Sequence, residues 1–191
     1  MKKLTSILLL LILISCSEIK QPPGILAEEQ PKQTSLSEPK SWDLDDFHFV
    51  ALANFELKAK VLGKERYTFG TESEISPYDL ALGWGKMSDQ SVVDKIEISQ
   101  SSRWFFWKVE SYPISKKEIE ISASNMHIIP ANEEVENQLS DLIMGEIIYL
   151  KGYLVEVNKG NNWHWKSSLS RNDTGNGACE VVWVNKLLRI K

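Results

Sequence analysis

The chain has 191 residues, with 22 lysines and arginines against 26 aspartates and glutamates, and a net charge of −4. Its pI is about 5.5, and no basic run interrupts the acidic balance. Without a basic patch the chain lacks the electrostatic footprint of a polyanion binder, so nucleic acid is excluded as an expected partner.

The N-terminus has the pattern of a bacterial export signal. Residues 1–3 (MKK) are basic, and residues 4–14 are almost wholly apolar but too few to span a membrane as a mature helix. Residues 13–16 (LISC) resemble the bacterial lipobox, whose cysteine receives a diacylglycerol, becomes the first residue after cleavage and is acylated on its amine. We therefore expect a signal peptide over residues 1–15 and lipidation at Cys16.

Lipidation sets the expected location. Several acyl chains on one residue anchor a protein stably, so the membrane is a partner through the lipid. Ser17 follows the cysteine, which in a host with two membranes resembles the outer-membrane sorting class. The predicted location is the cell envelope, with the folded part facing the periplasm or the outside.

Residues 16–41 are predicted to be the lipidated cysteine and a disordered tether. They hold four prolines among Glu, Gln, Lys and Ser, and they contain no aromatic residue. Such a segment cannot bury enough apolar surface to offset the entropy of ordering it. The remaining residues, 42–191, are enough for one domain with a substantial core.

Alternation along the domain predicts strands. Residues 55–62 alternate apolar and charged side chains, which is typical of a strand with one face in water. Residues 63–66 are predicted to turn into residues 67–69. Residues 103–110 are aromatic on both faces, which predicts a strand covered on both faces.

The second half of the domain contains the clearest strand. Residues 146–157 are long for a strand, and Gly152 in the middle indicates a bend or bulge. Residues 158–162 are predicted to turn this strand into a hairpin partner at 163–167, and residues 178–190 are predicted as the last strand.

Helix is scarce. Residues 133–144 have acidic residues at the start, an apolar stripe at helical spacing and Gly145 at the end, which predicts a helix. Residues 88–96 suggest a shorter one. Many short strands with one inserted helix predict a mainly β (α+β) fold, a small OB-like or SH3-like β-barrel. A β-sandwich is the alternative.

The loop at residues 167–177 is the first candidate site. Hydroxyls, Arg171, Asp173 and two glycines lie between two apolar strands. Backbone amides and the Arg171 fork suit a carboxylate or phosphate. The alternative is a long polar turn whose Asp173 bonds its own backbone.

Trp84 and His127 complete the ligand-binding hypothesis. Trp84 lies between two glycines, so it is either core or an exposed platform for a sugar ring or an extended peptide. His127 is flanked by apolar residues, which is typical of a core or rim histidine, with catalysis as the alternative. The hypothetical site groups Trp84, His127, Arg171 and Asp173, with Trp84 stacking and Arg171 holding an anionic group.

Catalysis is the rival function. Cys179 lies in an apolar strand-like run, which favours a buried small side chain over a reactive thiol. A hydrolase would use Cys179 with His127 as base, or a loop serine, but nothing in the sequence brings Cys179 and His127 together. Ser168 and Ser170 lack a G-x-S-x-G elbow. The chain has no HExxH or CxxC motif, and no metal or other cofactor is predicted.

Four stretches carry a resemblance: residues 79–85 (DLALGWG), 125–130 (NMHIIP), 151–155 (KGYLV) and 168–180 (SLSR to GACE). They resemble an uncharacterised bacterial envelope protein family, over most of the folded domain. The resemblance implies one structural unit and no particular activity. The sequence favours a membrane-anchored envelope lipoprotein that acts as a ligand-binding or scaffold module for a glycan, a peptide or a protein.

Overall fold

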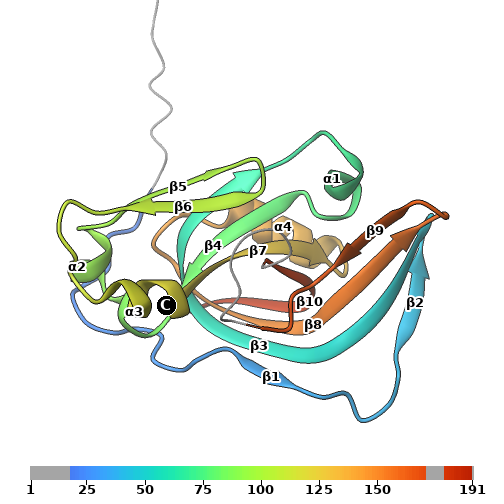
Figure 1. The fold of residues 1–191 in the computed structure, drawn as a ribbon, viewed down its shortest axis with the longest axis horizontal. Helices are drawn as coiled ribbons and strands as arrows, with labels where there is room; N and C mark the ends of the chain where they lie inside the picture. The colour runs from blue at the N-terminus through green and yellow to red at the C-terminus, as the bar shows by residue number, and fades with distance from the viewer. Residues whose placement is uncertain (1–17, 171–178, 191) are drawn as a thin grey trace, which may run out of the picture.

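The computed structural model describes residues 18–170 and 179–190, and within them five strands close a barrel (Figure 1). The pairing runs from β3 through β4, β7, β10 and β8 and returns to β3. β7 and β10 are parallel, whereas the other neighbouring pairs are antiparallel. The barrel strands are β3 (Phe47–Arg66), β4 (Tyr78–Gly83), β7 (Ala123–Pro130), β8 (Ile147–Lys159) and β10 (Glu180–Ile190).

One helix, α4 (Glu133–Asp141), connects the third and fourth barrel strands. The Asn132 side chain caps it by accepting a hydrogen bond from the Val135 amide, and Val135 and Leu139 are buried. A closed five-stranded barrel with a helix at this place confirms the predicted mainly β, OB-like barrel. The pairings return to their starting strand, because β3 pairs with β8 as well as with β4, and this closure favours the barrel over the sandwich alternative.

Two long strands make the closure possible. β3 has register irregularities between Ala51 and Ala53, where it pairs with β8, and between Val61 and Gly63, where it pairs with β4. A Cβ on Gly152 would lie 1.8 Å from the Trp183 carbonyl oxygen, so a larger residue there would separate β8 from β10. The turn predicted at residues 63–66 is wrong: β3 continues to Arg66 through a bulge between Val61 and Gly63.

Alternation divides the barrel strands into two faces. The inward side chains form a continuous apolar core, which includes Phe55, Leu57, Leu80, Met126, Ile128, Leu150 and Val182. A second cluster lies outside the barrel, where Phe49, Ile129 and Val181 pack under a group of tryptophans. The outer face of the sheet is therefore also partly buried. Outward side chains on the barrel strands can form a sheltered site there.

Shorter elements surround the barrel. The predicted strand 103–110 is β6 (Trp104–Lys108), which pairs with β5 (Glu97–Ser101) in a hairpin outside the barrel. Phe106 is 52% exposed, so β6 is not covered on both faces. The other elements are β1 (Lys32–Thr34), β2 (Ser41–Leu44), α1 (Thr71–Ile75), a 3-10 turn (Gly85–Ser88), α2 (Gln90–Val93), α3 (Lys116–Ile121) and β9 (Trp163–Lys166).

Residues 18–40, here called the N-terminal arm, differ from the disordered tether expected from composition. The arm runs along the outside of the barrel and adds β1 to β3 (Figure 1). The Ile19 amide donates to the Met144 carbonyl at 2.8 Å, and the Ala27 amide donates to the Ser88 hydroxyl at 3.0 Å. The arm has little apolar surface of its own, but the barrel supplies hydrogen-bond partners for its backbone, and composition does not reveal those partners.

The predicted signal peptide and Cys16 lie outside the described residues. Within the described part of the chain, no helix has the length and apolar character needed to cross a membrane.

Candidate functional site

A hollow of about 260 Å³ opens on the outer face of the barrel beside β7. Segments far apart in the chain meet there: the β3–β4 connection, the β5–β6 hairpin, β7, β9 and the start of β10. We call it the His127 hollow, and it is lined by Glu72, Arg103, Trp104, His127, Trp165, Lys166 and Cys179.

A buried aspartate lies behind this hollow. Asp79 points outward from β4 because its neighbours Tyr78 and Leu80 face the core, and it is directly opposite His127 in the β4–β7 pairing. Asp79 is fully buried, and its Oδ1 lies 2.9 Å from His127 Nδ1. The ring N–H is not aligned with that oxygen, so this is a close electrostatic contact rather than a well-formed hydrogen bond.

The tight turn between β5 and β6 places Arg103 beside the Asp79 carboxylate. Ser102 and Arg103 both have positive φ, at 52° and 65°, as a two-residue hairpin loop of the primed type requires. Arg103 Nη1 donates to Asp79 Oδ1 at 2.8 Å, and Nη2 donates to the Ser76 carbonyl at 3.0 Å. The left-handed backbone of an arginine is uncommon, and here it aims the guanidinium inward.

Aromatic rings flank the Arg103 guanidinium. Its central carbon lies 4.3 Å from the Tyr67 ring centre and 5.5 Å from that of Trp165. The Tyr67 hydroxyl accepts from the Arg103 amide at 2.8 Å, and burial raises the pKa of Tyr67 above its ordinary value, so the phenol stays neutral. Trp165 also lies 4.8 Å from the His127 ring. The indole thus contacts both basic side chains.

The side-chain amides of Asn125 and Gln100 connect the β5–β6 hairpin to the barrel. Asn125 Nδ2 donates to Asp79 Oδ2 at 3.2 Å and to the Arg103 carbonyl at 3.1 Å, while Gln100 Nε2 donates to Asn125 Oδ1 at 2.8 Å. A Cβ on Gly63 would lie 2.4 Å from Gln100 Oε1, so the glycine makes space for this amide. Both oxygens of Asp79 are therefore engaged.

The prediction that Trp84 is an exposed stacking platform is wrong. Trp84 is 1% exposed, belongs to the barrel core, and donates from Nε1 to Gln30 at 2.8 Å. It follows the far end of β4, where Gly83 is paired with Ala123, and therefore does not meet His127. The cover missing from its glycine neighbours is supplied by the N-terminal arm.

The other predicted residues have different outcomes. His127 is 5% exposed and lines the hollow, whereas Arg171 and Asp173 lie outside the described residues. Cys179 is half-buried and lines the same hollow as His127. The Ser168 hydroxyl donates to the Ser170 carbonyl and accepts from its amide, which is the local turn bonding of a hydroxyl loop.

Sequence reasoning missed Asp79, Arg103 and Trp165 as site residues. Asp79 gave a usable signal, because it is the only charged residue in the apolar run 78–85, and a charge in a buried strand requires a partner. The sequence around Arg103 gave no such signal, because Arg103 reaches Asp79 only through the conformation of the β5–β6 hairpin turn.

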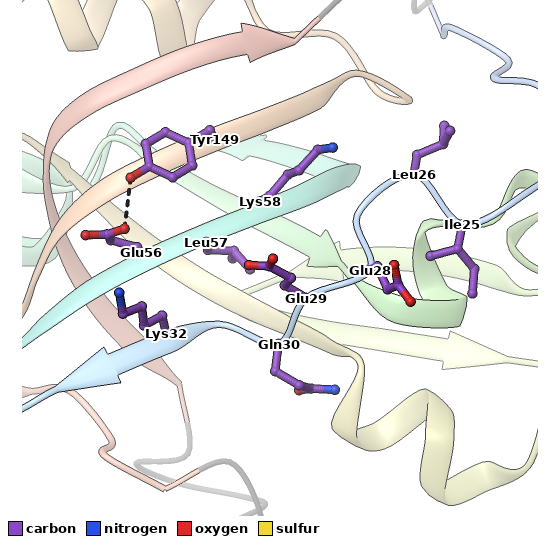
Figure 2. Close-up of a pocket in the computed structure, with 10 residues that line it drawn as sticks. All are labelled: Ile25, Leu26, Glu28, Glu29, Gln30, Lys32, Glu56, Leu57, Lys58 and Tyr149. Atoms are coloured by element: carbon purple, nitrogen blue, oxygen red, sulfur yellow. Dashed lines mark hydrogen bonds between the residues drawn. The ribbon is translucent and has the colours of Figure 1, made fainter.

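A larger hollow of about 500 Å³ lies between the N-terminal arm and the outer surface of β3 and β8 (Figure 2). Its charged side chains lie near the surface. Tyr149 donates to Glu56 at 3.0 Å, and Lys151 lies 2.7 Å from the same carboxylate. We call it the arm hollow, and it is lined by Ile25, Leu26, Glu28, Glu29, Gln30, Lys32, Glu56, Leu57, Lys58 and Tyr149.

Comparison of the chain with protein-family models, with curated proteins and with solved structures gave no significant match. Within the described residues, no group of three or more His, Cys, Asp or Glu side chains is arranged to hold a metal ion. Fold alone does not define function, which depends here on the chemistry of the His127 hollow.

Proposed function

We propose that the chain is a lipid-anchored lipoprotein of the bacterial cell envelope whose barrel binds a ligand in the His127 hollow. The observation that carries the binding role is the fully buried Asp79, which holds Arg103 and His127 beside the hollow. Burying charges costs free energy that an apolar contact would avoid, and such clusters gather at functional sites. The lipobox at residues 13–16 supports the anchoring role.

The position of the hollow supports the same proposal. OB-fold barrels bind oligonucleotides and oligosaccharides over their second and third strands, between the loops that join strands one to two and four to five. The second and third barrel strands here are β4 and β7, which carry Asp79 and His127. The corresponding loops contribute Glu72 and Trp165 to the lining. With nucleic acid excluded by charge, a glycan or a peptide is the expected ligand.

Size and chemistry narrow the ligand. A volume of about 260 Å³ is below the roughly 300–1,000 Å³ of sites that enclose a whole drug-sized molecule. The hollow therefore accepts one group, such as a sugar ring or the end of a side chain. Trp165 offers a flat apolar face, and Arg103 has five donors, of which Asp79 and Ser76 use two. A ring or side chain bearing a carboxylate fits both, as in an acidic glycan or an acidic peptide of the envelope.

Thermal unfolding of the full chain in detergent tests the binding proposal. The panel contains muropeptides, uronic acid oligosaccharides and acidic peptides. A ligand at 100 times its Kd adds about 2.7 kcal/mol, a rise in Tm of roughly 5–10 °C. We expect that rise to be lost in Arg103→Lys, which removes the planar fork, and in Trp165→Leu.

The matched control is Tyr149→Phe in the arm hollow, which should keep the full rise in Tm. A rise that survives both site variants, or that disappears in the control, contradicts binding in the His127 hollow.

Lipidation is tested separately. Wild-type protein made in a bacterial host should fractionate with the membrane and carry an acylated N-terminal cysteine, measured by mass spectrometry of the N-terminal peptide. Cys16→Ser should move the protein to the soluble fraction, whereas Cys179→Ser should leave it in the membrane. Unacylated wild-type protein would refute the anchor.

A further inference from the structure

The residue just before β10 is a cysteine, and it lines the same hollow as His127. Val181 is registered with His127 in the parallel β7–β10 pair, and it belongs to the cluster outside the barrel. Cys179 directly precedes β10, two positions before Val181, and the chain bends at this residue. The Cys179 carbonyl accepts from the Ser168 amide at 3.1 Å, which fixes the backbone at this point. Cys179 and His127 both line the hollow.

The histidine has the surroundings of a positioned base. Its side chain is 6% exposed, and Nδ1 faces the fully buried Asp79 carboxylate at 2.9 Å. Trp165 covers the ring. With Nδ1 against Asp79, Nε2 is the ring nitrogen that remains to act as the base. A nearby carboxylate stabilises the imidazolium that forms when the ring accepts a proton.

Charged side chains surround the cysteine in this hollow. Arg103, Lys166 and Glu72 line it together with Cys179, and Asp79 and Glu156 pair with the two cations. Reactive cysteines lie in partly exposed, electropositive surroundings, whereas inert ones are buried among apolar groups. Cys179 is half-buried and shares the hollow with a histidine, two cations and Glu72, so its surroundings are polar and partly exposed and not an apolar interior.

We propose that Cys179 is the nucleophile of an acyl-transfer reaction, with His127 as its base and Asp79 as a positioning residue. The proposal deepens the binding function and rests on it, because the substrate is an acyl ester carried by a ligand of the same hollow. The chemistry is that of a thiol hydrolase, in which nucleophile, base and orienting carboxylate act in series.

The reaction balances without a further reagent. The Cys179 proton passes to His127 Nε2 while the sulfur electron pair attacks the ester carbonyl carbon. The C–O bond breaks, the departing alcohol takes the proton from His127, and a thioester remains on Cys179. Water, deprotonated by His127, then attacks the thioester, and the acid leaves as the thiol is restored. The sum is ester plus water giving acid plus alcohol.

The test uses the full chain in detergent with p-nitrophenyl acetate as the acyl donor. Cys179 should become acetylated, as seen by peptide mapping, with a burst of p-nitrophenol. General-base catalysis contributes about 10²–10⁴-fold, so His127→Gln should slow acetylation of Cys179 by roughly 100-fold or more. The matched control is His164→Gln, because His164 also faces a carboxylate, Glu156 at 3.1 Å, but does so on the exposed side of β9. It should leave the rate unchanged.

A second readout separates chemistry from folding. The rate of Cys179 alkylation by iodoacetamide against pH should change its midpoint in His127→Gln and in Asp79→Glu, and a merely structural role would not move it. Acetylation that is absent, or equal in wild type and His127→Gln, overturns the proposal. If Cys179→Ser keeps the ligand-induced rise in Tm while wild type is not acetylated, binding stands and only the nucleophile is refuted. Acetylation without any ligand-induced rise would refute the binding proposal instead.

Discussion

The two hollows of this molecule differ in what lies behind them. The arm hollow is about twice as large, at about 500 Å³ against 260 Å³, but its charged side chains lie near the solvent, where Glu56 pairs with Lys151. The His127 hollow is backed by Asp79, whose two oxygens contact Arg103, His127 and Asn125. The volume of a hollow is therefore a weak guide to where a ligand binds. Polar groups fixed in a buried network are pre-organised for a ligand, whereas surface ion pairs rearrange freely in water.

Removing one charge behind each hollow should give the largest contrast. Asp79→Asn leaves the Arg103 guanidinium without its buried counter-charge, and breaking a buried pair in this way costs about 3–5 kcal/mol. Glu56→Gln removes a surface partner of Lys151, and such pairs are worth about 0–1 kcal/mol. Urea unfolding of both variants at neutral pH measures the two losses. Equal losses would mean that the two hollows are built alike.

A smaller effect concerns pH. The hydrogen bonds from Lys151 and then from Tyr149 lower the pKa of Glu56 below its ordinary value of 4.5. Because the folded-state pKa is the lower one, the stabilisation by Glu56 is fully present above about pH 4.5 and is lost as the pH falls through the folded pKa. The stability difference between wild type and Glu56→Gln should therefore be present at pH 7 and vanish at strongly acidic pH.

Urea unfolding of wild type and Glu56→Gln at a series of pH values measures this difference in stability. When both proteins also carry Lys151→Gln, the difference should become smaller. A difference that stays constant down to acidic pH would show that Glu56 acts through packing and not through its charge.

Local sequence patterns were sufficient to predict several elements of the barrel. The acidic start and apolar stripe of residues 133–144 predicted α4, although the helix ends earlier, at Asp141. The long run around Gly152 predicted β8, and its glycine lies where the Trp183 carbonyl approaches. These features are predictable because hydrophobic periodicity and backbone freedom act within a few residues of chain.

The site was only half visible. His127 and Cys179 were recognisable as residues able to carry chemistry, but their place at one hollow depends on how β7 and β10 pair in the barrel. Asp79 is opposite His127 through another pairing, and Arg103 arrives through a hairpin turn outside the barrel. Such partners are set by long-range register, which no local pattern contains.

The sequence by itself determined the mainly β class and the inserted helix, because strand alternation and helical periodicity are local properties. Tertiary structure decided which outward side chains meet, that Trp84 is buried, and that the N-terminal arm lies against the barrel. Those outcomes depend on surfaces made by segments far apart in the chain. The contacts between these surfaces, and the free energy they contribute, form only once the barrel has closed.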